Sequence, residues 1–538
     1  MSKEGSFDEK TKGDLQHVET LGNAHRMPKT PEQRQAELEA AMQVDPGVGK
    51  WSAAAMHMYW ITLIVCCCSG DSGFDGTVMG GINGMWQYQQ YFGMTGVGSK
   101  TSIVFGIYTI GSLCAVFPAA YLPDRFGRRF SMFFGNVILI VGALLTANSK
   151  NKSMFLVGRW LTGLGCGCAS ASAKSYLAEI TPPHTRGAYM GFLNSFYYIG
   201  QMSASGMMVA TNRWNNDLSW RLPLYIQVVP AAINALFIYT CPESPRWLCS
   251  VGKIDDARRI LARLHSSTAD PKSPLIDVEM DEIEEKIEIG GIDKRWWDFR
   301  PLFRTRADRY RSSMVVLIGT FGQLSGNGLV TYFLPILLKN AGITRQQRQQ
   351  QLNFVNSVTS YIGALAGSFT VDHTGRRKNL LWSTIAVTGI LAIVTGLLSE
   401  QGGAARSNAG IAFIFIFMVV FSFGWTPMQA LYPAEVLNYQ ARAKGIAFLT
   451  VATQAASCIN TFGLPVALER IGWKTYAIFC GWDVFECIII YLFVVETKSL
   501  TLEEVGEIFE QPNPVQFSKD LYRNKLANVN ENTLVSNA

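Results

Sequence analysis

A short basic sequence occurs twice in this chain, each time directly after a long apolar run. It reads Asp-Arg-Phe-Gly-Arg-Arg at 124–129 and Asp-His-Thr-Gly-Arg-Arg at 372–377. Two further landmarks return at nearly the same offset: Tyr-Leu-Ala-Glu at 176–179 with Tyr-Pro-Ala-Glu at 432–435, and Glu243 with Glu496. Three landmarks in one order at an offset of roughly 250 residues predict two related halves with the same arrangement of membrane spans.

The apolar runs of both halves agree with this prediction. Only 16% of the 538 residues are charged, against about 25% in ordinary soluble domains, and 48% are hydrophobic. A helix needs about 20 mostly apolar residues to cross the bilayer core. Runs of this kind predict spans near 56–80, 101–121, 131–148, 154–175, 188–210, 220–241, 312–338, 352–371, 380–398, 409–431, 446–467 and 474–495.

The sequence therefore predicts an all-α integral membrane protein with twelve transmembrane helices in two pseudo-symmetric six-helix halves. The expected divisions are a disordered cytosolic tail at 1–50, an N-terminal half at 51–241, a cytosolic linker at 242–311, a C-terminal half at 312–495 and a cytosolic tail at 496–538. Acidic residues spaced three apart, at Glu279, Glu282 and Glu285, indicate short helices in the linker.

The distribution of basic residues predicts the orientation in the membrane. The loops at 122–130 and 372–379 carry three basic residues each, whereas 81–99 carries none. Loops rich in Lys and Arg stay in the cytosol. We therefore expect a multi-pass protein of the plasma membrane with both termini and the linker in the cytosol.

Ionisable residues inside the spans are candidates for function, because a charge at the bilayer centre costs about 2.5–3.5 kcal/mol even on lenient scales. Asp71 and Asp75 lie one turn apart in the first span, and Arg159 lies in the fourth. If the distance from Asp75 to Arg159 and the access of water change as the halves move, the proton affinity of Asp75 changes with them. The alternative is a static ion pair that holds two helices in register.

The repeated loops supply charges for a gate network at the cytosolic ends of the helices. Its predicted members are Asp124, Arg128, Glu179, Arg186, Glu243 and Arg246 in the first half and Asp372, Arg376, Glu435 and Arg442 in the second. One exposed pair contributes only about 0–1 kcal/mol. A network that forms in one state and breaks in the other still shifts an equilibrium. The alternative role is topogenic, with basic residues holding the loops inside.

These motifs resemble the sugar porter branch of the major facilitator superfamily. The resemblance rests on the two basic loops, on Pro-Glu-Ser-Pro-Arg-Trp-Leu at 242–248 and on Glu-Thr-Lys at 496–498. Within that branch, the segments at 296–303, 326–328, 425–433 and 511–514 look like fungal lactose permeases and cellodextrin transporters. The resemblance implies a major facilitator fold and a sugar substrate.

The resemblance also implies which side chains bind the sugar. Gln and Asn suit this task because each offers a donor and an acceptor. The positions that match the binding residues of the family, or lie next to them, are Gln201, Gln323, Asn327, Tyr332, Asn356, Trp425, Gln429 and Gln454. Gly322 stands where the family has a glutamine and Ala430 where it usually has a tryptophan. These losses favour a site wide enough for a second sugar ring, unless Trp425 compensates for them.

The expected function is sugar:proton symport by alternating access, with a disaccharide such as lactose or cellobiose as substrate. The alternatives are a facilitative or proton-coupled transporter of hexose or pentose, and a non-transporting sugar sensor. The expected partners are a sugar, protons and the lipid bilayer, with no nucleic acid, and we expect a monomer. No metal-ligand cluster, phosphate loop or nucleophile arrangement occurs in the sequence, so we expect no cofactor, no metal and no enzymatic activity.

Overall fold

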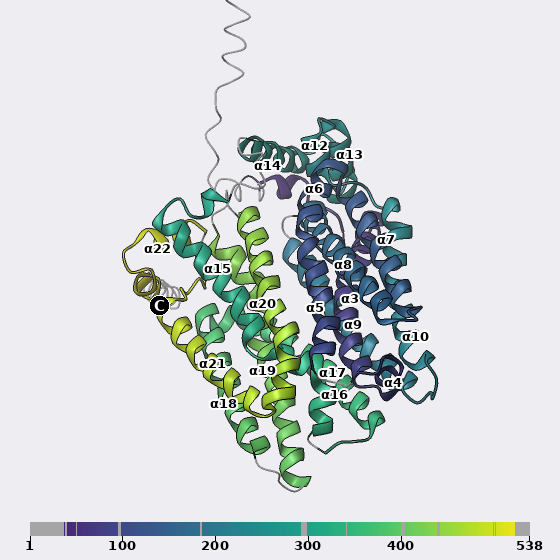
Figure 1. Ribbon diagram of the computed structural model, residues 1–538. Helices are drawn as coiled ribbons and strands as arrows, with labels where there is room; N and C mark the ends of the chain where they lie inside the picture. The colour runs from purple at the N-terminus through teal and green to yellow at the C-terminus, as the bar shows by residue number, and fades with distance from the viewer. Residues whose placement is uncertain are drawn as a thin grey trace, which may run out of the picture.

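The helices form two bundles that stand side by side in the computed structural model (Figure 1), the first drawn from purple to blue and the second from green to yellow. The structure describes residues 37, 40–49, 51–94, 98–182, 185–291, 299–340, 342–399, 404–437, 442–498, 500 and 502–521. Within these ranges all regular elements are helices and none is a strand. The predicted all-α class is therefore confirmed.

The first bundle contains the elements between residues 53 and 240. They are α3 (Ala53–Asn83), α4 (Trp86–Phe92), α5 (Ser99–Cys114), α6 (Val116–Phe126), α7 (Arg128–Ala147), α8 (Lys152–Ile180), α9 (Arg186–Thr211), α10 (Leu218–Ile226), α11 (Val228–Phe237) and the 3-10 turn η1 (Ile238–Thr240). α3 packs on α9, and α8 packs between α5 and α7. In this bundle, two of the predicted spans each consist of more than one helix. The second span is α5 with α6, and the sixth is α10 with α11.

The second bundle repeats this plan. Its helices are α15 (Arg306–Leu324), α16 (Asn327–Asn340), α17 (Gln346–Thr374), α18 (Arg376–Ser399), α19 (Ala404–Val436), α20 (Arg442–Ile471) and α21 (Lys474–Phe493). The seventh span is broken between α15 and α16, where Gly326 has a φ of +84°. Only glycine adopts such a backbone without strain, so Gly326 is the residue that allows the helix to break here.

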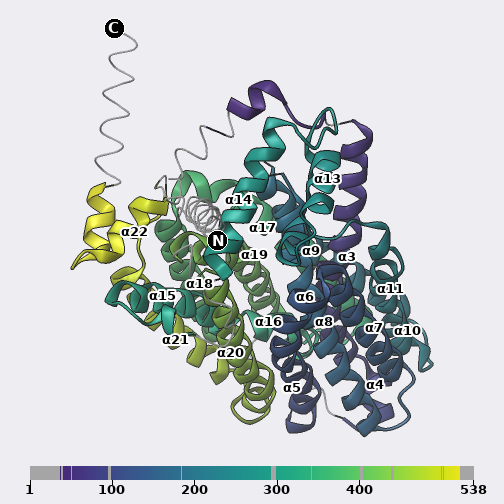
Figure 2. The same cartoon turned by 90° about the horizontal axis from the view of Figure 1, so that it is seen from above.

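Short helices cover one end of the bundles, which we call the linker end. They are α12 (Pro245–Ser250), α13 (Ile254–His265), α14 (Pro274–Gly291), η2 (Arg300–Leu302) and, after the second bundle, α22 (Leu502–Glu510). The view from above shows α13 over the first bundle and α22 at the edge of the second (Figure 2). The short helices expected between the halves are therefore present.

Residues 40–49 differ from the disordered tail that the sequence predicts up to residue 50. The carboxylate of Asp45 is 4% exposed and accepts hydrogen bonds from Ser266 Oγ (2.6 Å), Ser267 N (3.0 Å), Ser267 Oγ (2.7 Å) and Ser273 Oγ (2.7 Å). Burial alone would raise the pKa of Asp45, but these hydrogen bonds outweigh it and hold that pKa below its usual range. This segment is thus fixed to the turn between α13 and α14.

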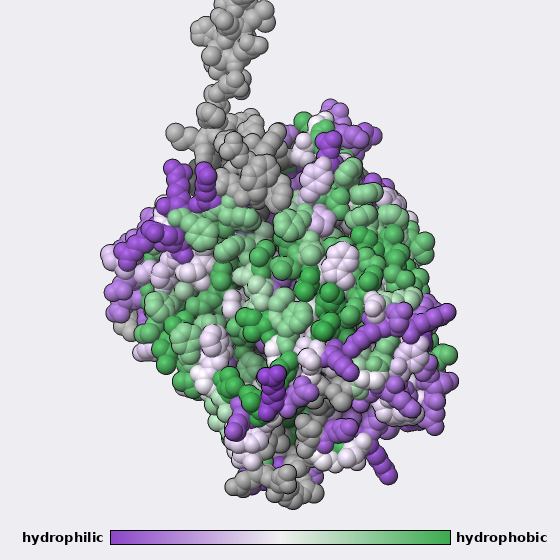
Figure 3. All heavy atoms as spheres, in the orientation of Figure 1, coloured by the Kyte–Doolittle hydropathy of each residue, from purple (hydrophilic) through white to green (hydrophobic). Residues whose placement is uncertain are grey.

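Nine helical segments in the described ranges are long and apolar enough to cross a membrane. Three more helices, α8, α9 and α17, are long enough to cross a membrane but are less apolar than these nine segments. Apolar side chains cover the middle of the face seen in Figure 3, and hydrophilic ones gather toward both of its ends. Less apolar helices of this length are tolerated in a bilayer where other helices shield their polar faces, and each of α8, α9 and α17 packs on helices on at least one side.

Small residues let α7 and α8 approach closely. A Cβ added to Gly142 would lie 2.6 Å from the backbone nitrogen of Thr162, and one added to Gly158 would lie 2.7 Å from that of Thr146. Glycine and other small residues play this role between membrane helices because van der Waals contact replaces the hydrophobic effect there. α7 and α8 therefore form a tight antiparallel pair.

The two bundles meet at the end opposite the linker end, which we call the far end. α3 packs on α16, α5 on α20 and α9 on α17. The hydrogen bonds across the interface include Gln350 Nε2 to Gly81 O (2.9 Å) and Ser102 Oγ to Phe462 O (2.9 Å). A Cβ on Gly80 would lie 2.9 Å from Thr331 O. The far end is thus closed by direct backbone and side-chain contacts between the halves.

Candidate functional site

An aspartate and an arginine meet inside the first bundle. Asp75 on α3 is 1% exposed and Arg159 on α8 is 2% exposed. Arg159 Nη1 lies 2.5 Å from Asp75 Oδ1, and the guanidinium lies over the ring of Tyr108, 4.6 Å from its centroid. Either charge alone would be very costly at this depth, so each stabilises the other. The structure brings the two predicted proton-coupling residues into direct contact.

A third residue of this cluster, Gln227, was missed by the sequence analysis. Its Nε2 donates to Asp75 Oδ1 over 2.7 Å. Gln227 ends α10 where the sixth span breaks before α11, so its side chain is aimed at α3. An isolated amide in an otherwise apolar span was the available signal, because polar residues in spans are costly.

The cluster keeps unpaired polar atoms. Asp75 Oδ2 and Arg159 Nε are buried without a hydrogen-bond partner among the described residues. Asp71, one turn away on α3, is 1% exposed, and neither of its oxygens has a partner within the same ranges. Buried polar atoms without partners are rare in proteins. The arrangement leaves Asp75 an open acceptor for a proton, a water or a substrate hydroxyl.

The predicted sugar-binding residues are spread over helices of both bundles. Gln201 is on α9, Gln323 on α15, Asn327 and Tyr332 on α16, Asn356 on α17, Trp425 and Gln429 on α19, and Gln454 on α20. Gln201, Asn356 and Trp425 are buried, and the other five are half-buried. Since α9 packs on α17 and α3 on α16, several of these residues lie on helices that form the interface between the halves.

Gly322 and Gln429 show how one departure from the family pattern is accommodated. A Cβ on Gly322 would lie 2.2 Å from Gln429 Nε2. The amide of Gln429 therefore occupies the space beside residue 322 that a longer side chain would need. On the neighbouring residue, the Gln323 carbonyl accepts a hydrogen bond from Asn460 Nδ2 on α20. This part of the site is filled and is not widened.

Two of the predicted binding residues retain unpaired polar atoms. Asn356 Oδ1 and Trp425 Nε1 have no hydrogen-bond partner in the described part of the chain. The Trp425 ring is fully buried and stacks on Phe421, with ring centroids 6.3 Å apart and planes 12° apart. The ring therefore belongs to the core of the second bundle. The side chain of Ala430 lies outside the described residues.

The charged residues of the first basic loop form a connected network at the linker end. Arg128 binds Glu179 through Nε (3.0 Å) and Nη2 (3.1 Å) and binds Asp124 through Nη1 (2.9 Å). Glu243 accepts from the backbone N of Arg128 (3.1 Å) and from Nε of Arg129 (3.3 Å). Bidentate Arg–carboxylate pairs are among the stronger side-chain contacts. Residues distant in sequence thus hold together the ends of α7 and α8 and the segment that precedes α12.

The second basic loop repeats the network. Arg376 Nη2 lies 2.8 Å from Glu435 Oε1, and the Arg376 backbone N donates to Glu496 Oε1 over 2.8 Å. Thr497 Oγ1 donates to Glu435 over 2.5 Å, as Ser244 Oγ does to Glu179 over the same distance. The pseudo-symmetry therefore extends to individual hydrogen bonds.

Among the residues whose side chains the structure describes, two predicted gate residues, Arg186 and Arg246, lie outside these networks. Arg186 Nε is buried without a partner among the described residues, and no ion pair there includes Arg246. Both arginines instead line a cavity of about 80 Å³ between α8 and the linker helices. The side chains of Asp372 and Arg442 lie outside the described residues.

His265 joins the linker helices to the base of α8 beside this cavity. Its Nδ1 lies 2.5 Å from Glu279 Oε2 on α14, and its Nε2 lies 3.0 Å from the Ile180 carbonyl. Both ring nitrogens face acceptors, an arrangement that favours the protonated ring with its two donors. Burial and the charge of Arg186 lower the pKa of His265, but Glu279 and the Ile180 carbonyl outweigh them and raise it above its usual value.

Comparison with known families agrees with this fold. The family described as sugar (and other) transporter matches residues 61–509. The chain therefore belongs to that family, and it is a multi-pass membrane protein with the major facilitator fold.

Individual relatives cover most of the chain at low identity. The transporter criB of Aspergillus cristatus is 26% identical over 85% of this chain and 96% of its own length. Hexose transporter HXT10 of Saccharomyces cerevisiae is 26% identical over 91% of both chains. A high-affinity glucose transporter of Kluyveromyces lactis is 28% identical over 84% of this chain and 86% of its own. None of these three is named as a lactose or cellodextrin permease.

Solved structures share the architecture. The inward-open xylose transporter XylE from Escherichia coli superposes with a TM-score of 0.69 at 20% identity, covering 84% of this chain and 99% of its own. At this identity the match concerns the fold. The same protein, described as a proton:xylose symporter, superposes with a TM-score of 0.68 when bound to a halogenated glucose.

Proposed function

We propose that this protein is a sugar:proton symporter that works by alternating access. The buried ion pair of Asp75 and Arg159 is the observation that carries the proposal, because a charge pair in the membrane interior marks ion pathways and proton relays. The similarity to proteins named as sugar transporters supports the sugar substrate.

Proton coupling follows from the electrostatics of the pair. A proton on Asp75 removes its negative charge, which weakens the attraction of Arg159 and frees α3 to move relative to α8. When the proton leaves, the charge returns and the pair re-forms. Gln227, bonded to the same oxygen, keeps the carboxylate oriented during both steps. The protonated and the charged acid therefore favour different arrangements of the first bundle.

The sugar is held between the halves by Gln201, Gln323, Asn327, Tyr332, Asn356 and Gln454. Their amide and hydroxyl groups supply donors and acceptors, and Asn356 contributes an oxygen that has no partner in the described part of the chain. The networks around Glu179 and Glu435 act as the gate at the linker end, which we assign to the cytosol of a cell with this protein in its plasma membrane.

The substrate is a monosaccharide, a hexose or a pentose. Gln429 fills the space beside Gly322, and curated relatives are named for hexose or glucose. A second candidate is a disaccharide such as lactose or cellobiose, for which Ala430 in place of the usual tryptophan is the favouring observation.

Uptake in a yeast strain without its own sugar porters tests both substrate and coupling. Labelled glucose, xylose, lactose and cellobiose are supplied with and without a protonophore. We expect uptake of glucose or xylose that the protonophore stops. If only disaccharides are taken up, the monosaccharide assignment is wrong. If the protonophore does not reduce uptake, the protein is a facilitator. No uptake by protein shown to be at the surface would favour a sensor.

The variant Asp75→Asn tests the proton site. We expect its accumulation ratio to fall to about 1 while sugar exchange across the membrane continues, because the amide cannot take up and release a proton. Asp71→Asn makes the same chemical change one turn away and is expected to leave accumulation intact. Full accumulation by Asp75→Asn would rule out its proposed role.

A further inference from the structure

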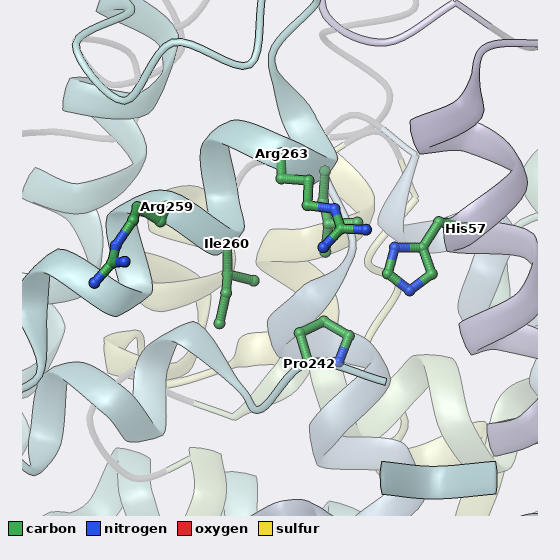
Figure 4. A pocket seen from close by; sticks show the side chains of 6 residues that line it. His57, Pro242, Arg259, Ile260 and Arg263 are labelled. Carbon is green, nitrogen blue, oxygen red and sulfur yellow. The ribbon is translucent and has the colours of Figure 1, made fainter. Parts of the chain in front are cut away.

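A basic cleft lies at the linker end between α13 and the start of α3. Its cavity has a volume of about 160 Å³ and is lined by His57, Pro242, Arg259, Ile260, Arg263 and Leu264. Figure 4 shows Arg263 reaching from α13 toward the ring of His57, above Pro242, with Arg259 on the other side of Ile260. Three basic side chains thus surround one small space with an apolar floor.

The arginine charge of this cleft is only partly balanced by the protein. Within the described ranges no ion pair includes Arg263, and His57 Nδ1 is buried there without a hydrogen-bond partner. Arg263 is exposed, and its charge disfavours a second positive charge on His57. The acid nearest to Arg259, Asp256, is already bound to it at 2.6 Å. An arginine without an ion pair, facing an imidazole nitrogen without a partner, leaves this cavity open to an anionic group.

The surroundings of the cleft identify the kind of anion. The elements that carry His57 and Pro242 expose aromatic rings beside it: Tyr59 is 42% exposed, Trp60 39% and Tyr239 51%. Trp60 Nε1 donates to Thr240 Oγ1 over 3.2 Å, which fixes the ring against η1. Exposed Trp and Tyr gather at the depth of the lipid headgroups. An anion in the cleft therefore sits at headgroup level.

We propose that this cleft binds the phosphate of an anionic phospholipid in the leaflet at the linker end. Arg263 and His57 donate to the phosphate oxygens, and Arg259 lies at the rim. The guanidinium is planar and carries donors in a fork that matches phosphate. Basic pockets at the cytosolic membrane surface recognise lipid headgroups in this way.

The bound lipid would link the linker to the first span. Leu264 and Ile260 of α13 pack in the same apolar cluster as Met58 and Ile61 of α3. A phosphate between Arg263 and His57 adds a polar connection between these two helices. Lipid composition then acts on the position of α13, independently of sugar or proton binding.

Native mass spectrometry of the purified full-length protein in detergent tests the site. Phosphatidylglycerol is titrated against wild type, Arg263→Gln and His57→Gln, with Lys253→Gln as the matched control. Lys253 precedes α13, is exposed and lies outside the cleft. We expect both cleft variants to bind phosphatidylglycerol about tenfold more weakly and the Lys253 variant to bind it as wild type does.

Two further ligands distinguish an anionic lipid from a zwitterionic lipid and from a soluble phosphate ester. Phosphatidylcholine, which is zwitterionic, is expected to bind more weakly than phosphatidylglycerol, and glycerol 3-phosphate is expected not to compete. Equal affinity of wild type and the cleft variants would overturn the proposal. Competition by glycerol 3-phosphate would overturn the lipid assignment in favour of a soluble phosphate ester. If Arg263→Gln does not fold, His57→Gln carries the test.

Discussion

At the scale of single residues, the two basic loops depend on a glycine for two separate reasons. Gly127 and Gly375 have φ values of +94° and +89°. A Cβ there would lie 2.6 Å from Glu243 Oε2 in the first half and 2.7 Å from Glu496 Oε2 in the second. The glycines therefore allow both the turn of the chain and the approach of a carboxylate that accepts the next backbone N–H.

The variant Gly127→Ala is expected to lower the thermal stability of the protein and its transport. The backbone of Gly127, with φ +94° and ψ 162°, lies in a region that is adopted almost only by glycine and costs other residues about 1–3 kcal/mol. The new methyl group also displaces Glu243. Gly252→Ala is the control, since Gly252 has a φ of +81° but no atom within 4 Å of its Cβ position. The melting temperature of both variants is measured by following unfolding with a thiol-reactive dye, and their transport is measured as sugar uptake. Equal losses in the two variants would show that the contact with Glu243 contributes nothing.

The sequence predicted which charged residues gather in each loop but not the geometry that joins them. Glu179 and Glu435 occur at corresponding positions of the two halves, as do Arg128 and Arg376. This correspondence was enough to predict that each arginine lies near the glutamate of its own half. The contact of Gln227 with Asp75 could not be predicted, because it depends on the angle at which α10 turns into α11. The burial of Glu279 was also missed, since a charge repeated along a helix gives the same pattern on a solvated face.

At the scale of elements, α13 and α14 are held from two sides. His265 and Glu279 tie them to the C-terminal end of α8, and Asp45 ties the turn between them to the segment before α3. Both ties are buried and fully hydrogen-bonded, which makes them stronger than exposed pairs. The linker is therefore a part of the first bundle rather than a free connection.

The tie through His265 predicts a dependence on pH. Its pKa is raised in the folded protein, so the stabilisation is complete below the unfolded value of about 6.5 and is lost as the pH rises through the folded pKa. The protection of the α13 and α14 amides, taken relative to the intrinsic exchange rate at each pH, is expected to fall over that range. In His265→Gln this protection should be low at all pH values and show no such step. A step that persists in this variant would assign the titration to another group.

The tie through Asp45 predicts how its removal affects residues 40–49. Asp45→Asn replaces a charged acceptor of several hydrogen bonds, each worth about 1.5–3 kcal/mol, by an amide with a single acceptor oxygen. We expect faster proteolysis of this segment and unchanged melting of the membrane bundles. Val44→Ala is the control for a substitution in the same segment, because the Val44 side chain is 71% exposed. Equal proteolysis of Asp45→Asn and wild type would contradict the role of Asp45.

At the scale of the whole molecule, the halves are in contact at the far end, through α3 with α16, α5 with α20 and α9 with α17. Transport by alternating access requires these contacts to separate once in each cycle. Thr109 and Thr461 lie on opposite sides of the interface, with their hydroxyl oxygens 3.3 Å apart.

A disulfide across this interface is expected to stop transport. The double variant with Thr109→Cys and Thr461→Cys places two thiols at bonding distance. Its uptake should fall to background after oxidation and recover when dithiothreitol is added. Each single variant, which retains the eleven native cysteines, should keep its uptake under oxidation. Continued uptake by the oxidised double variant, with the crosslink verified by mass spectrometry, would mean that this end does not open.

The modest apolar content of α8, α9 and α17 has a consequence for biosynthesis. A segment leaves the translocon for lipid when its own transfer free energy is favourable, which is a matter of side-chain hydropathy. The helix α7 contains a stretch apolar enough to meet that condition alone, whereas α8 does not. We therefore expect α8 to enter the bilayer together with α7, as a hairpin.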